Sequence, residues 1–271
     1  MRETISGRTD VYFMIGHPVT QVRTPSLFNG WAAKNGVDAA MLSLDLAADG
    51  IAPFFETLRR TANARGAVVT VPHKQAAFRH LDRALPTPAF VEACNVVRRE
   101  PDGTLTGAMT DGLGYVTALA ANGIALGDAD FLLIGAGGAG SAIAYEAARR
   151  GVARMVVIDQ NAERRETLRR KLAEVFPKLD CPAAIPEKIT CDIACNATPV
   201  GMAGDPGHPF PLDDLPDGAA VTDVVTDPAK TPWLLAAQDR GMTIQTGIEM
   251  VEAQFDLILA ELLGGNRQDP G

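Results

Sequence analysis

The sequence predicts an α/β protein that combines an N-terminal α/β domain with a Rossmann-type, doubly wound dinucleotide-binding domain. Apolar runs typical of strands alternate with helical patterns along most of the chain. One apolar run ends in a turn with glycines at 135, 137 and 140, a pattern typical of dinucleotide binding. The length of 271 residues allows two domains, because one domain usually takes about 100–200 residues.

Composition and charge restrict the classes of function. Hydrophobic residues make up 46% and charged residues 21% of the chain, which suits a globular protein with a sizeable core. The net charge is −8 and no Lys/Arg tract is present, so we expect neither a nucleic-acid nor a membrane partner. The cysteines and histidines show no metal-ligand spacing, so no metal is predicted. Because neither a signal peptide nor a long apolar run is visible, the expected location is the cytoplasm.

Residues 1–110 are predicted to form the first α/β domain. Apolar and β-branched runs predict its strands, at residues 10–15, 40–46, 65–71 and 91–97. Helical spacing of apolar residues predicts helices, at 26–35 and 51–64. Asp102 and Gly103 are a hairpin turn signal. A helix that starts near Asp111 is expected to lead into the second domain.

Lys74 follows the third of these predicted strands. Pro72 cannot continue a sheet ladder, so it is expected to end the strand and to place Lys74 at a strand-to-helix turn. Functional groups of α/β proteins gather at such turns. Taken alone, Lys74 is also explained as a solvated lysine at a helix start. Asp111, which precedes a glycine, is likewise explained as a helix N-cap.

Residues 111–247 are predicted to form the dinucleotide-binding domain. The glycine turn lies between a strand at 131–134 and a helix at 139–150. Its glycines permit a tight turn, close approach of the backbone to a pyrophosphate, and close packing of the helix on the strand. The start of the helix offers N–H groups to phosphates. The predicted cofactor contacts here are Gly135, Gly137, Gly138, Ala139 and Gly140.

Asp159 ends the next predicted strand, at 154–159, and bears on the choice of cofactor. It follows the glycine turn by about 20 residues, which is the spacing of the acid that hydrogen-bonds a ribose hydroxyl. NADP carries a phosphate there, and two unit charges about 4 Å apart interact by about 4 kcal/mol at an effective dielectric of about 20. Arg164 and Arg165, one helical turn further on, leave NADP use open. We predict that NAD is preferred.

The rest of the chain continues the alternation, so a doubly wound sheet of about six strands is predicted. Further strands are expected at 190–196, 221–225 and 242–246, with a helix at 231–241. The last helix, at 248–263, is amphipathic and is expected to stop at Gly264. Its predicted apolar stripe consists of Ile248, Val251, Phe255, Ile258, Leu259 and Leu262.

Short motifs in a fixed order connect these segments to a known family. They are Gly16-x-Pro18 with Thr24, Pro25 and Asn29; the run from Val69 to Lys74; Asn95; Thr110-Asp111-Gly112-x-Gly114; Asn196 and Thr198 with Gly201 and Met202; and Gly247, Met250 and Gln254. On these motifs the sequence resembles the shikimate/quinate dehydrogenases over nearly its whole length.

The resemblance implies a substrate domain, residues 1–110 joined by the C-terminal helix 248–271, and an NAD-binding domain, residues 111–247, with a cleft between them. Lys74 and Asp111 are implied to be the catalytic pair. The lysine ammonium handles the proton on the reacting oxygen while hydride moves to or from nicotinamide. The implied substrate contacts are Thr24, Thr70, Asn95 and Gln254. The implied nicotinamide-side contacts are Asn196, Thr198, Val225, Gly247 and Met250.

The sequence departs from the family at the loop that binds the substrate carboxylate. The family carries two serines there, and this chain has Val22 and Thr24, of which only Thr24 keeps a hydroxyl. A hydrogen bond to a charged group is worth about 1.5–3 kcal/mol, so shikimate affinity is expected to fall tenfold or more. Arg23 offers a charge in its place, although a solvated loop residue explains it as well. Other departures are Val225 for a tyrosine, and Met109 and Val68 for asparagines.

The sequence therefore predicts an NAD-preferring dehydrogenase that interconverts shikimate or quinate with its 3-dehydro form. One alternative keeps this chemistry on another cyclic polyol or acid, because of Val22. Another is an NAD-binding regulatory protein without turnover, although a pure binder has no need of Lys74 and Asp111. The expected partner is a small cyclic hydroxy acid, and the protein is expected to be a monomer or a homodimer.

Overall fold

The computed structural model describes residues 5–20 and 22–264, and its contacts divide the chain into two compact units. The first unit comprises Met1–Thr110 with Phe255–Gly271, and the second comprises Asp111–Gln254. The second boundary therefore falls inside the last helix, α9 (Gly247–Leu263). Residues 265–271, which the sequence assigns to the substrate domain, lie outside the described part of the chain.

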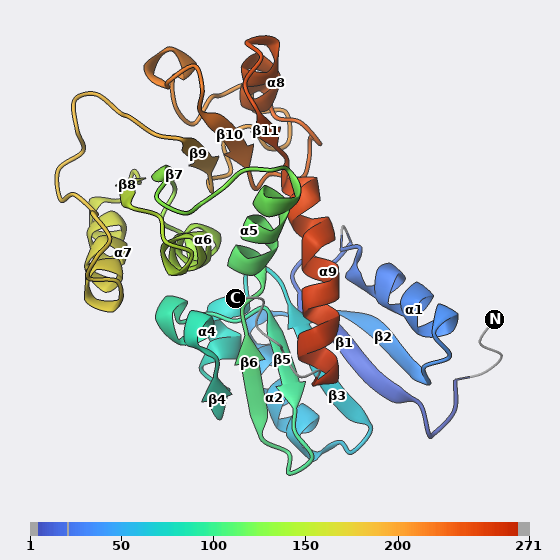
Figure 1. Cartoon of the computed structure of the whole chain (residues 1–271). Coiled ribbons are helices and arrows are strands. Elements are labelled where there is room, and N and C mark those ends of the chain that lie inside the picture. Colours follow the sequence, from blue (N-terminus) through green and yellow to red (C-terminus); the bar gives the residue numbers. More distant parts are fainter. Residues whose placement is uncertain (1–4, 21, 265–271) are drawn as a thin grey trace. The chain divides into compact units, whose positions relative to one another are not determined.

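A mixed sheet forms the centre of the first unit (Figure 1). Its strands are β1 (Asp10–Gly16), β2 (Ala39–Asp45), β3 (Ala64–Val69), β4 (Arg83–Ala84), β5 (Val96–Arg99) and β6 (Leu105–Ala108). They lie in the order β2-β1-β3-β5-β6-β4, and the first three are parallel. Because β5 runs antiparallel to β3, the start of β5 lies at the same sheet edge as the end of β3.

Helices cover both faces of this sheet. They are α1 (Thr24–Lys34), α2 (Ile51–Arg60), α3 (Lys74–Phe78) and α4 (Pro86–Val91). Phe28 of α1 packs with Tyr12 and Met14 of β1 in one apolar cluster, which also contains part of α9. Phe55 of α2 packs with Ile15 of β1 in a second cluster on the other face. The alternation of side chains along β1 thus supplies both cores.

Two predicted elements of the first unit are wrong. The helix predicted at 51–64 ends at Arg60, because a turn follows at residues 62–63 and β3 already begins at Ala64. The strand predicted at 91–97 is divided: residue 91 ends α4, a turn follows with Glu92 in the left-handed region (φ 54°), and β5 begins only at Val96. Pro86 favours the start of α4, because its fixed φ suits the first helical turn.

A parallel sheet forms the centre of the second unit. Its strands are β7 (Asp130–Ile134), β8 (Arg154–Ile158), β9 (Ile193–Asn196), β10 (Ala220–Asp223) and β11 (Ile244–Gln245). They lie in the order β11-β10-β9-β7-β8, so the chain changes direction across the sheet between β7 and β9. The doubly wound fold is as predicted, but the sheet of the described residues has five strands instead of about six.

The helices of the second unit are α5 (Asp111–Ala121), α6 (Gly138–Arg149), α7 (Ala162–Val175) and α8 (Pro232–Asp239). α8 places Trp233 and Leu234 in an apolar cluster with Leu132 and Val221 of the sheet. α5 packs closely on α6, because a Cβ at Gly112 would meet the carbonyl oxygen of Ala142 at 2.2 Å. The fold thus leaves the carboxyl ends of β7 to β10 as the place where loops meet.

α9 contributes to each unit with a different part. Met250 and Gln254 are buried and belong to the second unit, whereas Ile258, Leu259 and Leu262 join the core of the first. The predicted apolar stripe is wrong at Val251, which is 39% exposed. In the first turns of α9 it is Met250 that is buried instead. No helix in the described part of the chain has the length and hydropathy to cross a bilayer.

Candidate active site

The glycine turn joins β7 to α6. Gly135 has a φ of +102°, and a Cβ at Gly140 would meet the Gly135 carbonyl oxygen at 1.9 Å, so both positions favour glycine. A Cβ at Gly137 or Gly138 would meet no described atom within 4 Å, so the space before the turn is open. Gly138 and Ala139 begin α6, whose N-terminus is capped by no side chain of the described residues. This open cradle at a helix N-terminus fits the pyrophosphate of a dinucleotide.

Asp159 follows β8 and is turned towards the glycine turn. Its Oδ2 accepts a hydrogen bond from the Ala136 N–H at 2.7 Å, and its Oδ1 accepts one from the Asn161 N–H at 2.8 Å. Its side chain is only 8% exposed, whereas Arg164, whose Nη1 lies 3.8 Å from Oδ2, is 55% exposed. The carboxylate is thus held in place beside the turn, where it can accept from a ribose hydroxyl.

The residues predicted to lie beside the nicotinamide gather where β9 and β10 end. Asn196 ends β9, and its Oδ1 accepts from the N–H and the hydroxyl of Thr198 at 3.0 and 2.6 Å. A Cβ at Gly135 would meet Cγ2 of Thr198 at 2.8 Å, so this loop lies against the glycine turn. A Cβ at Gly247 would meet the Val225 carbonyl oxygen at 2.4 Å, so α9 begins against the segment after β10. The structure therefore places four of the predicted residues in the segments that follow β9 and β10 and at the start of α9, namely Asn196, Thr198, Val225 and Gly247.

Sequence reasoning missed Asp223, the last residue of β10. Its Oδ1 accepts from Asn196 Nδ2 at 3.1 Å and from the Val225 N–H at 2.9 Å, and its Oδ2 accepts from the Thr231 hydroxyl at 2.8 Å. The side chain is fully buried, and burial raises the pKa of the carboxyl above its ordinary value. The one signal in the sequence is an acid at the end of a buried strand.

The lysine turn lies at the end of β3. Thr70 follows the strand, and its N–H donates to the Ile15 carbonyl at 2.9 Å. His73 is buried and its Nε2 lies 2.7 Å from the carbonyl oxygen of Leu46, which ties the turn to the segment after β2. Lys74 then begins α3, and its own carbonyl oxygen accepts from the Cys94 N–H at 3.1 Å. The half-buried Lys74 is thus held at the carboxyl end of the parallel strands, as predicted from Pro72.

Asn95 lies at the same edge of the first sheet, immediately before β5. It is buried, its Oδ1 accepts from the Thr110 N–H at 2.9 Å, and its Nδ2 donates to the Thr110 hydroxyl at 2.9 Å. One of these bonds is accepted and the other donated, so together they fix the plane of the carboxamide. The Val69 N–H donates to the Asn95 carbonyl at 2.7 Å, which places Asn95 beside the end of β3.

Asp111 and Gln254 are brought together within the second unit. Asp111 is the first residue of α5, and its Oδ1 accepts from Gln254 Nε2 at 2.9 Å. Both side chains are buried, at 5% and 8% exposure. A Cβ at Gly114 would meet Cγ of Gln254 at 2.3 Å and the carbonyl oxygen of Met250 at 2.9 Å. Gly114 therefore lets α9 approach α5 closely enough for this bond, which explains the glycine spacing after Asp111.

The opening loop places an apolar side chain, Val22, beside the core of the first unit. The Val22 side chain packs, partly buried, against the apolar cluster that contains Phe28, so it faces hydrocarbon. Arg23 is exposed and precedes α1, and Thr24 is the half-buried first residue of that helix. Asn29 holds α1 to β2 through bonds of 2.8 and 3.0 Å with the backbone of Met41.

The predicted site residues thus form groups inside each unit. In the first unit, Thr70, Lys74 and Asn95 lie around the carboxyl end of β3, and Thr24 lies at the start of α1. In the second unit, Asp111 is bonded to Gln254, and the glycine turn lies beside Asp159, Asn196 and Thr198. The described residues contain no cluster of His, Cys, Asp or Glu side chains arranged to hold a metal.

Comparison with known proteins gives consistent matches. The family model of the shikimate dehydrogenase substrate binding domain matches residues 14–97. A protein of Methylobacterium radiotolerans named shikimate dehydrogenase (NADP(+)) is 33% identical over 246 residues, which cover 88% of this chain and 86% of the relative.

Two solved structures are similar over nearly the full chain. The shikimate 5-dehydrogenase of Listeria monocytogenes, in complex with shikimate and NAD, has a TM-score of 0.88 and 28% identity, and the match covers 99% of this chain and 96% of that one. The ligand-free 5-ketofructose reductase of a Gluconobacter strain has a TM-score of 0.85 and 27% identity, over 96% and 94% of the two chains.

Proposed function

The chain belongs to the shikimate dehydrogenase family of nicotinamide-dependent oxidoreductases that act on CH–OH groups, and we propose that it transfers hydride between NAD and a ring carbon of shikimate or quinate. The product of oxidation is then the 3-dehydro form. The observation that carries this proposal is the buried Asp159 carboxylate, bonded to the Ala136 N–H inside an open glycine cradle.

The choice of NAD rests on the charge of Asp159. Its carboxylate accepts two backbone N–H bonds, which hold it beside the glycine turn. A ribose hydroxyl can donate to that carboxylate, whereas the phosphate of NADP is repelled by it. Arg164 lessens the repulsion, but its guanidinium lies in solvent, where screening weakens it. The Methylobacterium relative is named for NADP(+), whereas we propose that this chain prefers NAD. In this proposal, Asp159 and its neighbours are the cause of the difference.

Lys74 and Asp111 are the proposed catalytic pair. The nicotinamide, when bound, supplies the hydride chemistry. Lys74 Nζ donates a hydrogen bond to the reacting oxygen, and moves its proton, at the stage when negative charge develops there. Asp111, held by Gln254, accepts from a substrate hydroxyl and fixes the ring. Thr70 and Asn95 lie at the Lys74 end of the first sheet and orient the remaining hydroxyls; Thr24 is the proposed contact in the opening loop.

A second substrate class is favoured by Val22. Its side chain packs against the hydrophobic core, so the loop offers one hydroxyl fewer to a substrate carboxylate. The Gluconobacter structure bears the name of a ketose reductase, and a ketose has no carboxylate. The alternative is therefore the same hydride transfer on a neutral cyclic polyol or ketose, with Lys74 and Asp111 in the same roles.

The proposal is tested by NADH formation from NAD with shikimate, quinate and carboxylate-free cyclitols, and by NADH consumption with 5-ketofructose. We expect the highest kcat/KM with shikimate or quinate. A higher value with a neutral compound would select the second class. Absence of turnover with every compound, together with tight NADH binding, would contradict both and favour a regulatory protein.

The Val22→Ser variant separates the two substrate classes further. Restoring a hydroxyl adds a hydrogen bond to a charged group, so kcat/KM for shikimate is expected to rise about tenfold or more. Val22→Ala is the matched control, because it loses the same apolar contacts without gaining a donor. If the two variants behave alike with shikimate, the residue at position 22 does not contact the substrate carboxylate.

A further inference from the structure

The strand order defines where the two halves of a dinucleotide lie. The glycine turn follows β7, and Asp159 follows β8 on one side of it. If Asp159 binds the adenosine ribose, as the proposed function states, the other half of the dinucleotide extends over the opposite neighbours of β7. These are β9 and then β10, so the nicotinamide half lies over Asn196 and the segment after Asp223.

The Asp223 carboxylate joins three segments at that edge. Asn196 Nδ2 connects it to the loop after β9, and the Val225 N–H connects it to the segment after β10. The Thr231 hydroxyl connects it to the start of α8, where Thr231 also caps the helix through the Leu234 N–H. These bonds of 2.8 to 3.1 Å all end at the carboxyl edge of the sheet, and none runs into the apolar core.

The bond to Asn196 extends the reach of Asp223. Because Nδ2 donates to Asp223, the amide is oriented with Oδ1 towards Thr198, which donates to it through both its N–H and its hydroxyl. The Thr198 hydroxyl in turn accepts from the Val200 N–H at 3.2 Å. The whole loop beside the glycine turn is thus held by a chain of bonds that starts at one carboxylate.

Asp223 accepts hydrogen bonds from neutral groups, which distinguishes it from a member of a stabilising ion pair. An amide, a backbone N–H and a hydroxyl hold a fully buried carboxylate, and no cation of the described residues lies within ion-pair distance. Burial raises its pKa, so the ionised form is kept in the folded protein at a cost in stability. Polar groups kept at such a cost cluster at functional sites.

We propose that Asp223 is a positioning residue, which fixes the loops after β9 and β10 so that Asn196, Thr198 and Val225 hold the nicotinamide half of the cofactor. It does not itself touch the cofactor. The inference rests on the proposed function only for the identity of the cofactor, and it concerns one half of that molecule.

The test compares two ligands by isothermal titration calorimetry with the full chain. NADH contains both halves, whereas ADP-ribose contains the adenosine half and the pyrophosphate without nicotinamide. In Asp223→Asn, one acceptor oxygen becomes a donor, so the loop bonds cannot all form. We expect the Kd of NADH to rise about tenfold or more, as the loss of a charge-assisted bond implies, and that of ADP-ribose to change less than about twofold.

Asp192→Asn is the matched control. Asp192 precedes β9 at the opposite edge of the same sheet, and its Oδ2 also accepts a backbone N–H, that of Asp130, at 2.8 Å. The control is expected to leave both Kd values unchanged. If Asp223→Asn raises the Kd values of NADH and ADP-ribose equally, or changes neither, the proposal is wrong. A carboxylate that only stabilises the domain would affect the binding of both ligands to the same extent, or of neither.

A second pair of variants serves if Asp223→Asn does not fold. Thr231→Val removes one donor to the carboxylate, and Thr231→Ser retains the hydroxyl. We expect weaker NADH binding with unchanged ADP-ribose binding for the valine variant, and wild-type binding for the serine variant. An equal effect of the two substitutions would overturn the proposal. All of these experiments measure binding and none measures turnover. A wild-type protein that binds NADH without turnover would therefore contradict the proposed function, whereas the comparison of Kd values would still test the role of Asp223.

Discussion

Lys74 is the residue on which the proposed chemistry depends most directly. The sequence places it at a strand-to-helix turn through Pro72, and the structure holds that turn by bonds of His73 and of the Lys74 carbonyl. These bonds do not involve the ammonium group, so they remain when the Lys74 side chain is removed.

We predict that Lys74→Ala lowers kcat by about 10²–10⁴-fold, because general acid–base catalysis contributes that range. The Kd of NADH is expected to change less than about twofold, because the glycine turn and Asp159 belong to the other unit. Steady-state kinetics and a fluorescence titration measure the two quantities. A variant that keeps its kcat would show that another group handles the proton.

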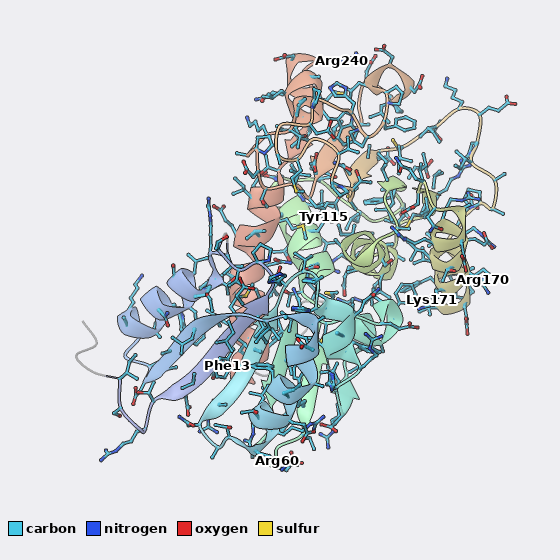
Figure 2. The ribbon with its side chains drawn as sticks, turned by 180° about the vertical axis from the view of Figure 1, so that it is seen from behind. Phe13, Arg60, Tyr115, Arg170, Lys171 and Arg240 are labelled. Carbon is cyan, nitrogen blue, oxygen red and sulfur yellow. The ribbon has the colours of Figure 1, made fainter. Side chains whose placement is uncertain are left out.

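Asp223 leads to a prediction about pH. Its pKa is higher in the folded chain than in the unfolded chain, so stability is lost as the pH rises from the ordinary carboxyl pKa through the folded value. The nearby titratable groups do not interfere, because burial raises the pKa of Cys195 to about 12 and that of Tyr115, labelled in Figure 2, well above its ordinary value.

The free energy of unfolding of the wild type minus that of Asp223→Asn is therefore expected to fall as the pH rises above the ordinary aspartate pKa of about 4. The asparagine does not titrate, so the difference isolates the one carboxyl. Urea unfolding at several pH values measures it. A difference that grows with pH would mean that the folded protein favours the ionised form.

Some candidate site residues could be predicted from their neighbours in the sequence, whereas others depend on contacts between distant segments. Gly135, Asp159 and Lys74 lie in short motifs whose meaning depends on neighbours in the chain. Asp223 depends on donors from residues 196, 225 and 231, which only the parallel pairing of β9 and β10 brings together. No spacing in the sequence encodes that meeting, so the residue was missed.

At the scale of elements, close helix packing places the carboxylate of Asp111. α5 crosses α6 at Gly112 and α9 at Gly114, and in both places a Cβ would meet a backbone carbonyl oxygen closer than 3.0 Å. From the sequence, Asp111 taken alone was explained as a helix N-cap, and the glycine that follows it was given no role. The structure shows that Gly112 lets α5 approach its neighbour α6 closely.

We predict that Gly112→Ala destabilises the protein by about 1–3 kcal/mol, because its Cβ would meet the Ala142 carbonyl oxygen at 2.2 Å and backbone must shift. Gly30→Ala is the matched control, since Gly30 also lies in a helix but a Cβ there has no neighbour within 4 Å. That control is expected to gain up to about 1 kcal/mol from helix propensity. Equal stabilities of the two variants in urea unfolding would contradict the close packing of α5 on α6.

Element boundaries were predicted less well than element types, for a physical reason. The alternating strands and helices of both units follow from periodicity, and most agree with the structure. The strand predicted at 91–97 failed because apolar residues there serve a helix end, a turn and a strand in succession. Val251 failed because the helical period alone does not say which side of α9 meets protein and which meets solvent.

At the scale of the whole molecule, the proposed reaction draws on both units. Lys74, Thr70 and Asn95 belong to the first, whereas Asp111, Gln254 and the cofactor loops belong to the second. The sequence predicted the fold class and this distribution of roles, and the family comparisons support the fold and the class of enzyme. The choice of substrate is proposed to depend on the Val22 loop.

The central claim, an NAD-preferring dehydrogenase, is tested most directly by kcat/KM with NAD and with NADP at a saturating concentration of the best substrate. We predict a ratio of about tenfold or more in favour of NAD, since a phosphate beside the Asp159 carboxylate costs at least about 1.4 kcal/mol. Asp159→Asn, which removes the charge and keeps the shape, is expected to bring the ratio towards one. A wild-type protein that prefers NADP would contradict the account.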